Sequence, residues 1–278
     1  SDVCSSDLLS SGDYHASVEG RAIAGLVSDL SGLTFSTRTG TLFAVANRPV
    51  QILELSRDGL LLRRIPVDGA GDLEAITHAG GDRFIIADEA SDRLIWVTIS
   101  PETRRVDLSV APDLVLNGRL LPNLGVEGLS WDRCHSRLFV AHEMLPMRVT
   151  RIDGVTETDT GGVSAQEATE WRPLMPLGHS FADLSSVSVL DGSGNLVLLS
   201  HLTSALAEFS PKGRPLGLLL LWAGHHGLQR TIPQAEGIAL DDEGTIFVVS
   251  EPNLFYRFSR KAADGWQPAP CEARAPES

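Results

Sequence analysis

The 278-residue chain has few cysteines, few basic residues and no long apolar run. Its three cysteines, Cys4, Cys134 and Cys271, are too few and too widely spaced to predict a disulfide framework or a structural zinc site, since both need closely spaced pairs. No stretch approaches the roughly 20 apolar residues that cross a bilayer. Lys and Arg total 23 against 36 Asp and Glu, a net charge of −13, so we expect no nucleic-acid partner.

Common catalytic and ion-binding motifs are also missing. There is no GxSxG nucleophile motif, and HEMLP at His142 does not match the HExxH of zinc hydrolases. The acidic turns at Asp191 and Asp241 lack the terminal glutamate of an EF-hand. His225 and His226 are adjacent in a Gly-flanked loop, which is not the i, i+4 spacing of helical zinc ligands. These motifs therefore identify no activity.

The two ends of the chain differ from the rest. Residues 2–8, DVCSSDL, resemble the translation of a sequencing adapter, so we treat residues 1–9 as a non-native leader. Residues 263–278 form a Pro-rich tail, and residues 10–262 are long enough for one large domain with a full core. A signal peptide or membrane anchor could have preceded Ser10, so the start of this chain does not decide its compartment.

What the sequence does contain is a repeat. Five segments read as a short apolar strand, a polar turn and a second strand rich in Val, Ile, Leu and Phe, which is typical of β-hairpins. They are DLSGLTFSTRTGTLFAVAN from Asp29, DLEAITHAGGDRFIIADE from Asp72, GVEGLSWDRCHSRLFVAHE from Gly125, ADLSSVSVLDGSGNLVLLSH from Ala182 and QAEGIALDDEGTIFVVSE from Gln234. A third strand follows each of them: VQILELS, RLIWVTIS, RVTRID, ALAEFS and LFYRFS.

The repeat spacing predicts an all-β fold, a five-bladed β-propeller with four strands in each blade. The aligned residues Ser31, Glu74, Glu127, Ser185 and Glu236 differ by 43, 53, 58 and 51 positions, close to the roughly 40 to 50 residues of a propeller blade. Candidate outer strands are LLLRRIPV, VDLSVAP, a stretch before Trp171, and PLGLLLLW. The N-terminal YHASVEGRAI would supply the missing strand of the last blade and close the ring. A sandwich of hairpins is the structural alternative.

The repeats also predict where a site would lie. The second strand of each hairpin ends at Asn47, Glu89, Glu143, His201 or Glu251, which lie 16, 15, 16, 16 and 15 residues after the aligned positions. In an antiparallel hairpin the start of one strand lies beside the end of the next, so the ten residues should surround one mouth of the central channel. Three blades thereby present a glutamate pair each: Glu74 with Glu89, Glu127 with Glu143, and Glu236 with Glu251.

Carboxylates crowded around an axis raise one another's pKa or require a cation. Calcium suits such an oxygen-rich set with little imidazole and no thiolate, whereas magnesium needs a tighter octahedron. We therefore predict that the metal ligands come from the six glutamates, with Asp29, Asp72, Asp88 and Asp183 nearby as reserves. The alternative is that these glutamates are solvated rim residues, or cap backbone N–H groups between blades, and need no ion.

Several segments resemble the SdiA-regulated family of bacterial envelope proteins. They are SGLTF with TLFAVANRPVQILEL, VEGLSW with RLFVAHE, and AEGIALDDEGTIFVVSEPNLFYRF, and the likeness runs from about Leu26 to Arg260. The resemblance implies a five-bladed propeller related to NHL-repeat proteins, a calcium site, no established enzymatic activity and often an N-terminal membrane anchor. It implies a location on the periplasmic side of the bacterial inner membrane. Two departures stand out: Ala75 replaces the glycine of EGI, and His201 stands where an acidic residue is expected.

These observations lead to three functional hypotheses. The first is a calcium-stabilised binding or scaffold propeller, which we expect to be monomeric and to bind a divalent cation and a small-molecule or protein ligand. The second is a metal-dependent hydrolase of the lactonase, esterase or phytase type, with His201 or a surplus glutamate as the base. The third is a protein-interaction platform without an ion.

Overall fold

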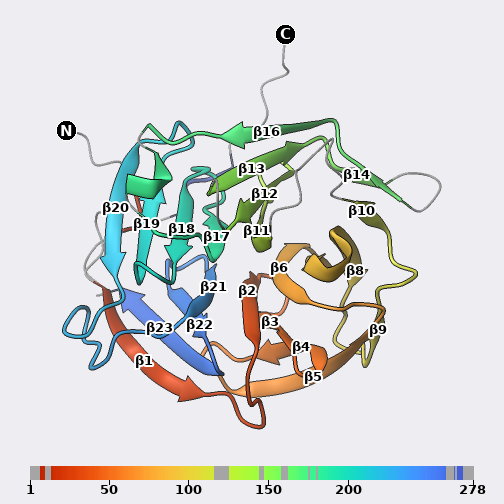
Figure 1. Cartoon of the computed structure of the whole chain (residues 1–278), viewed down its shortest axis with the longest axis horizontal. Coiled ribbons are helices and arrows are strands. Elements are labelled where there is room, and N and C mark those ends of the chain that lie inside the picture. Colours follow the sequence, from red (N-terminus) through yellow and green to blue (C-terminus); the bar gives the residue numbers. More distant parts are fainter. Residues whose placement is uncertain are drawn as a thin grey trace.

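The computed structural model describes residues 7–9, 14–115, 125–143, 147–157, 162–174, 176–179, 181–260, 266 and 268–271. Five antiparallel sheets of four strands are arranged in a ring around a central axis (Figure 1), which confirms the predicted five-bladed propeller. In each sheet the first strand of the repeat lies innermost. No helix among the described residues combines the length and the apolar character needed to span a membrane.

The blades follow one another along the chain. Blade 1 is β2 (Leu30–Ser36), β3 (Thr41–Asn47), β4 (Val50–Leu55) and β5 (Leu61–Asp68). Blade 2 is β6 (Leu73–Gly80), β7 (Arg83–Asp88), β8 (Arg93–Thr98) and β10 (Asp113–Val115). Blade 3 is β11 (Val126–Asp132), β12 (Arg137–His142), β13 (Arg148–Asp153) and β16 (Glu167–Trp171). Blade 4 is β17 (Ser186–Val189), β18 (Leu196–Ser200), β19 (Ala205–Phe209) and β20 (Pro215–Leu220).

Blade 5 closes the ring with the N-terminal strand. It consists of β21 (Ala235–Leu240), β22 (Ile246–Ser250), β23 (Leu254–Arg260) and β1 (Tyr14–Ala22). Strand β1 pairs antiparallel with β23, from Tyr14 opposite Arg260 to Ala22 opposite Leu254. The prediction that the N-terminal strand completes the last blade is therefore confirmed. The sheet edge that β23 would otherwise expose is paired.

One predicted outer strand is wrong. The segment VDLSVAP was expected to complete blade 2, but β9 (Val106–Asp107) pairs in parallel with β5 of blade 1. The outer strand of blade 2 is β10, which begins at Asp113 and pairs with β8. The apolar alternation of this segment fits both an outer strand of blade 2 and a short bridge to blade 1. Val106 is buried in the observed bridge, just as it would be in an outer strand.

Besides β9, four short elements among the described residues lie outside the blades. A two-stranded ribbon, β14 (Thr156–Glu157) with β15 (Val163–Ser164), projects from blade 3. Two single-turn 3-10 helices, η1 (Glu89–Ser91) and η2 (Leu177–His179), follow β7 and precede β17.

The core is divided among the blade interfaces. Each of the five hydrophobic clusters joins two adjacent blades. Between blades 1 and 2, for example, the rings of Phe43 and Phe84 lie 4.6 Å apart and both side chains are fully buried. Burying such side chains contributes on the order of 2 kcal/mol each, so the ring is stabilised wherever two sheets meet.

Glycines allow the inner strands to approach one another closely. A Cβ on Gly128 would lie 2.8 Å from Val187 N of the next blade, and one on Gly237 would lie 2.8 Å from Leu33 N. These glycines follow the aligned Glu127 and Glu236, which explains why the EG pair recurs. In blade 2 the residue is Ala75, and its Cα lies only 2.8 Å from where a Cβ of Gly32 would be.

A series of hydroxyl groups links the inner strands around the ring. Thr34 Oγ1 accepts from His78 N at 3.0 Å, Thr77 Oγ1 from Trp131 N at 3.0 Å and Ser130 Oγ from Val189 N at 2.8 Å. Each hydroxyl is three residues after the aligned position, so the same repeat position satisfies a backbone N–H of the following blade. Because these groups are buried, each bond removes a desolvation penalty of about 1 kcal/mol or more.

Residues from both flanking segments pack against the propeller. Leu8 and Leu9 are buried, and their N–H groups donate to the carboxylate of Glu208 at 2.9 and 2.6 Å. At the other end, Cys271 forms a disulfide with Cys134, with Cα atoms 5.3 Å apart. The cysteine spacing did not predict this bond, because the two residues are 137 positions apart.

Candidate functional site

The predicted mouth residues do gather around one end of the channel. A cavity of about 540 Å³ opens there, and nine of the ten predicted residues line it: Ser31, Asn47, Glu74, Glu89, Glu127, Glu143, His201, Glu236 and Glu251. The exception is Ser185, which is buried and donates its hydroxyl to Ala235 O at 2.8 Å. All six glutamates predicted as metal ligands therefore face one cavity. Whether they bind a metal stays a prediction.

Irregular strand pairing places three of these glutamates. In blade 2, Leu73 pairs with Asp88 and Ala75 with Ala87, so Glu74 is an extra residue in β6. Glu127 in β11 and Glu236 in β21 occupy the same position in their blades. Such a β-bulge turns a side chain away from its regular direction and recurs beside functional sites. The repeated bulge thus directs three carboxylates towards the axis.

The second column of mouth residues is fixed by its own backbone. The N–H of Asn47, Glu89, Glu143 and Glu251 donates to the carbonyl two residues before the aligned position of the same blade, at 3.2, 2.8, 3.4 and 3.0 Å. Hairpin geometry therefore sets the separation of each pair. The Asn47 side chain is already engaged, since its Oδ1 accepts from Leu73 N at 2.8 Å and its Nδ2 donates to Leu73 O at 3.2 Å.

Burial perturbs the mouth carboxyls strongly. Burial, with the charges of Glu127 and Asp72, raises the pKa of Glu74 to about 9. Burial and the neighbouring Glu143 raise the pKa of Glu127 to about 8. The pKa of Glu236 rises to about 7 because of burial, although His201 opposes the rise. Without a cation, these groups hold protons at pH values where free glutamates are ionised.

The carboxylates of blade 2 lie closest together. One oxygen each from Asp72, Glu74 and Glu89 lies within 4.8 Å of the others, a spacing that suits ligands of a single ion. Glu127 of blade 3 adjoins this group across Gly125. A Cβ on Gly125 would lie 3.0 Å from Glu89 Oε1 and 3.2 Å from Glu127 Oε1. The missing side chain leaves room for both carboxylates.

Positive charge is scarce among the described residues at the mouth. Among the described side chains that line the cavity, Arg48 is the one arginine, and it is 78% exposed and paired with Asp29 at 2.5 Å. Its charge is therefore already balanced by a residue outside the glutamate pairs. His201 is the other basic side chain among the described residues of the lining, which also holds Asp72 and the six glutamates. The mouth is a concentrated anionic site.

His201 is held in place by an aspartate behind it. Its Nδ1 lies 2.8 Å from Oδ2 of Asp183 and 3.7 Å from Glu236 Oε1. Asp183 is fully buried and also accepts from Leu202 N at 3.1 Å and from the Ser200 hydroxyl. The hydrogen bond to Asp183 raises the pKa of His201, and burial opposes this rise. The imidazole is thereby oriented at the cavity wall.

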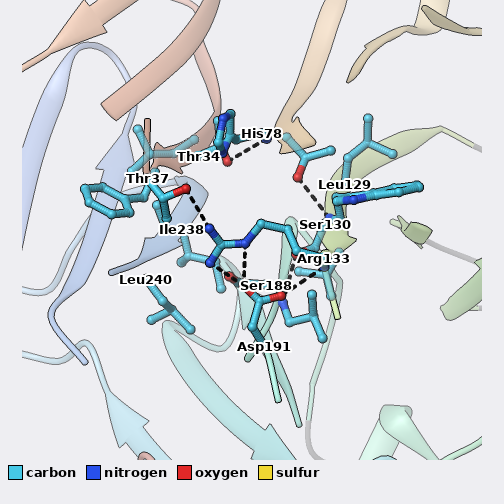
Figure 2. Close-up of a pocket in the computed structure, with 17 residues that line it drawn as sticks. Thr34, Thr37, His78, Leu129, Ser130, Arg133, Ser188, Asp191, Ile238 and Leu240 are labelled. Carbon is cyan, nitrogen blue, oxygen red and sulfur yellow. Dashed lines mark hydrogen bonds and ion pairs between the residues drawn. The ribbon is translucent and has the colours of Figure 1, made fainter. Parts of the chain in front are cut away.

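The opposite end of the channel is closed by Arg133 (Figure 2). Its Nη1 donates to Thr37 Oγ1 at 2.6 Å, and its Nε donates to Asp191 Oδ2 at 2.6 Å. Only a small polar cavity of about 50 Å³ remains there, between the inner strands. Arg133 and Asp191 therefore occupy this end, whereas the larger cavity lies at the mouth.

Sequence reasoning missed some residues of this end of the molecule. Arg48, Gly71 and Gln234 line the cavity but lie just outside the aligned columns. Asp29 and Asp72, which the sequence predicts as acidic reserves near the mouth, line it as well and so were not missed. The repeat itself could have identified the three missed residues. Residues that flank the starts of equivalent strands lie at the same end of the ring in every blade.

Solved structures with the same fold include several functionally different proteins. The Myxococcus xanthus glutaminyl cyclase is 16% identical, with a TM-score of 0.57 over 88% of this chain and 95% of that chain. A luciferin-regenerating enzyme is 14% identical, with a TM-score of 0.54 over 91% of this chain and 98% of that one. Likenesses at this level of identity concern the fold alone.

The sequence itself is more informative about kinship. The family model described as SdiA-regulated matches residues 6–259, which is most of the chain and all five blades. The matched range includes both columns of mouth residues and the closing strand β1. The chain belongs to the SdiA-regulated family.

Proposed function

We propose that this protein is a calcium-binding β-propeller of the bacterial cell envelope that acts as a binding or scaffold module. The observation that carries the proposal is the convergence of Glu74, Glu127 and Glu236, from three different blades, on one partly buried cavity. Each has a pKa raised by burial, so ionising them together requires a compensating positive charge.

The donor set fits calcium. The cavity offers carboxylate oxygens from several directions, with one imidazole and no thiolate among the described residues that line it. Calcium accepts six to eight oxygen ligands in flexible geometry, as a ring of long glutamate side chains provides. The Asp72, Glu74 and Glu89 group, with Glu127 beside it, would hold the ion. Bound there, it would link blades 2 and 3 and stabilise the folded ring.

Two observations support a location in the envelope. The Cys134–Cys271 disulfide is of the kind that persists in oxidising compartments such as the periplasm. Relationship to the SdiA-regulated family points the same way, because the sequence resemblance implies envelope proteins. We therefore propose that the domain works on the periplasmic side of the inner membrane, as a monomer with a small-molecule or protein ligand at the mouth.

Thermal unfolding with calcium tests the proposed function. At calcium concentrations about 100-fold above Kd, the free energy of unfolding should rise by about 2.7 kcal/mol over the value in chelator. Glu127→Gln removes a ligand charge without changing size and should abolish most of this increase. Glu102→Gln, in an exposed turn far from the mouth, is the matched control and should respond as the unmodified protein does.

Two outcomes would contradict the proposal. The first is an absence of any calcium-dependent increase at millimolar concentrations. The second is an increase that Glu127→Gln leaves intact, because the ion would then bind elsewhere. Repeating the melts with magnesium distinguishes a selective calcium site from general screening of the acidic mouth, since screening would favour neither ion.

One observation favours a second candidate function, that of a metal-dependent hydrolase. Asp183 orients His201 at the wall of the cavity, beside Glu236. An imidazole held by a buried carboxylate is a suitable general base for a water molecule. A bound ion would supply polarisation of an ester or phosphoester oxygen. The residues of this chain would orient the substrate and accept the proton.

An activity panel separates the two candidates. Lactones, esters and phosphoesters should be tested with calcium and with chelator, using the unmodified chain and His201→Asn. Hydrolysis that needs the cation and is lost in the variant would establish the enzyme. A blank panel from a protein whose melting temperature still responds to calcium would favour the binding module.

A further inference from the structure

A second cavity lies between blades 3 and 4, at the ends of the inner strands that are remote from the mouth. It has a volume of about 280 Å³ and is lined by Arg137, Arg151 and His135 together with Phe139, Trp171 and the turn at Gly192–Gly194. None of these residues takes part in the mouth. The cavity therefore needs its own explanation.

Strand register brings the two arginines to one face of blade 3. Arg137 and Phe139 are two residues apart in β12, and Phe139 pairs directly with Arg151 of β13. Since side chains alternate along a strand, all three point to the side that packs against blade 4. Asp153, two residues after Arg151, lies on the same face of β13.

Asp153 holds both guanidinium groups through their Nε atoms. Arg137 Nε lies 2.7 Å from Asp153 Oδ1, and Arg151 Nε lies 2.6 Å from Oδ2. Asp153 does not line the cavity, whereas both arginines do. The terminal guanidinium nitrogens of Arg137 and Arg151 donate no hydrogen bond to any residue that the structure describes. Five N–H donors per guanidinium exceed what one shared carboxylate can accept.

The two arginines and the acidic residues near this cavity are paired in different ways. Two arginines share one carboxylate, so this cluster carries an excess positive charge in a chain whose net charge is −13. Asp132 is the acidic residue among the described residues of the lining, and it has hydrogen-bond donors of its own. It lies 2.7 Å from His135 Nδ1 and accepts from Cys134 N and His135 N at 3.0 and 3.1 Å. The cavity therefore offers an anion the terminal N–H groups of two guanidinium groups that share one carboxylate.

The aromatic side of the cavity and the turn at Gly192 are held in place by hydrogen bonds. Trp171 donates a hydrogen bond from its Nε1 to Pro211 O at 2.9 Å. Its ring also packs edge-on against the ring of Phe209, with the ring centroids 5.7 Å apart. Across from it, Gly192 N donates to the sulfur of Cys134, which the disulfide joins to Cys271. The tail disulfide thus braces the turn that forms one wall. A preformed pocket of this kind loses little entropy when a ligand binds.

We propose that this cavity binds a small organic oxyanion, with a carboxylate or phosphate between Arg137 and Arg151 and a flat apolar body against Trp171 and Phe139. Paired guanidinium groups recognise such oxyanions by bidentate hydrogen bonds. A volume of about 280 Å³ admits a molecule the size of an aryl carboxylate or aryl phosphate. The site does not depend on the cation proposed at the mouth.

Ligand-observed NMR and calorimetry on the full chain test this site with defined probes. Benzoate and phenyl phosphate should bind with saturable affinity, and benzamide, which has the same shape as benzoate without its charge, should bind at least tenfold more weakly. Inorganic phosphate should also bind at least tenfold more weakly than phenyl phosphate, since it lacks the apolar body.

Variants locate the binding. Arg137→Gln and Arg151→Gln should each weaken benzoate binding roughly tenfold or more, because each removes charge-assisted hydrogen bonds. Arg105→Gln, whose side chain is 61% exposed and pairs with Asp68 on blade 1, is the matched control and should bind as the unmodified chain does. Asp153→Asn keeps both guanidinium groups and removes their shared counter-charge, so affinity should be retained or increased.

The Asp153→Asn variant keeps the test decisive if an arginine variant unfolds. A folded Asp153→Asn protein that loses benzoate binding would overturn the proposal, because the arginines would then have only a structural role. Equal binding of benzoate and benzamide would overturn it too, as would arginine variants that fold and bind unchanged. Chelator should leave benzoate binding unaltered, which separates this site from the mouth.

Discussion

The two ends of the central channel are built from the same five inner strands and differ in how their charges are balanced. At the closed end, Arg133 spans the opening and donates to Asp191 and Thr37. At the mouth, carboxyls from three blades face one another, and burial raises the pKa of Glu74 to about 9 and that of Glu127 to about 8. One end carries its own cation and the other is anionic.

The contrast shows how one scaffold separates stability from binding. Repeated hydroxyls and glycines along the strands hold the blades together, whereas the strand starts, where β-bulges turn side chains towards the axis, carry the reactive groups. Charge at the closed end should therefore matter for folding alone. Charge at the mouth should matter according to what is bound there.

The largest effect is expected at the closed end. Arg133→Ala removes the cation that balances Asp191, and we expect the free energy of unfolding to fall by about 3 kcal/mol, because it leaves a mostly buried carboxylate without its ion pair. Chemical denaturation in calcium and in chelator should give the same loss. A loss that appears in only one of the two conditions would mean that the ends are coupled.

The free energy of unfolding should depend on pH because of the mouth carboxyls. Glu74, Glu127 and Glu236 have pKa values of about 9, 8 and 7 in the folded protein, above the 4.5 of free glutamate. Their protonated forms therefore stabilise the fold fully below pH 4.5, and this stabilisation is lost as pH rises through 7 to 9. Three independent groups would lower the free energy of unfolding by about 4 kcal/mol between pH 7 and pH 9. Because these carboxyls raise one another's pKa, we expect about half of that in chelator, roughly 2 kcal/mol.

Denaturant titrations across this pH range measure the effect, and calcium should remove most of it. The reason is that a bound cation favours the ionised carboxylates. Stability that is constant with pH in chelator, or that rises towards pH 9, would contradict the account of the mouth.

A smaller effect is expected from the space between blades 2 and 3. Gly125→Ala places a Cβ about 3 Å from carboxylate oxygens of Glu89 and Glu127, so these side chains must move. We expect calcium affinity to fall roughly tenfold, about 1.4 kcal/mol, with stability in chelator nearly unchanged because both carboxylates have flexible side chains. Calorimetry of the folded variant measures the calcium affinity. An unaltered affinity would contradict a calcium site between Glu89 and Glu127.

The smallest expected effect concerns the hydroxyls between blades. Thr77→Val keeps the shape of the side chain but leaves Trp131 N without its acceptor, which should cost about 1 kcal/mol in any calcium concentration. Thermal unfolding against the unmodified chain measures it. Thr39→Val, in the exposed turn of blade 1, should have no comparable effect.

Much of this architecture could be predicted from sequence, because the repeat fixes it. Strands of matching pattern at matching spacing predicted the blades, the closing strand and the ring of residues at the mouth. Segments outside the repeat were harder to predict. Val106 forms a bridge to blade 1 rather than an outer strand of blade 2, since a short apolar alternation fits both.

Contacts between residues far apart in the sequence also could not be predicted. Cys134 and Cys271 bond across 137 residues, and spacing carries no information on such a contact. Similarly, Arg137, Arg151 and Asp153 form one cluster only because β12 and β13 are paired in a particular register. From the sequence alone, these three residues cannot be distinguished from ordinary charged surface residues.

Calcium titration by calorimetry at pH 7, in two buffers of different ionisation enthalpy, tests the central claim most directly. If calcium binds the buried mouth carboxyls, Glu74 and Glu127 must release protons that they hold at this pH, so the measured enthalpy should depend on the buffer and correspond to about one or more protons released per ion bound. Binding without proton release would place the ion on exposed carboxylates, and no binding would contradict a calcium site at the mouth.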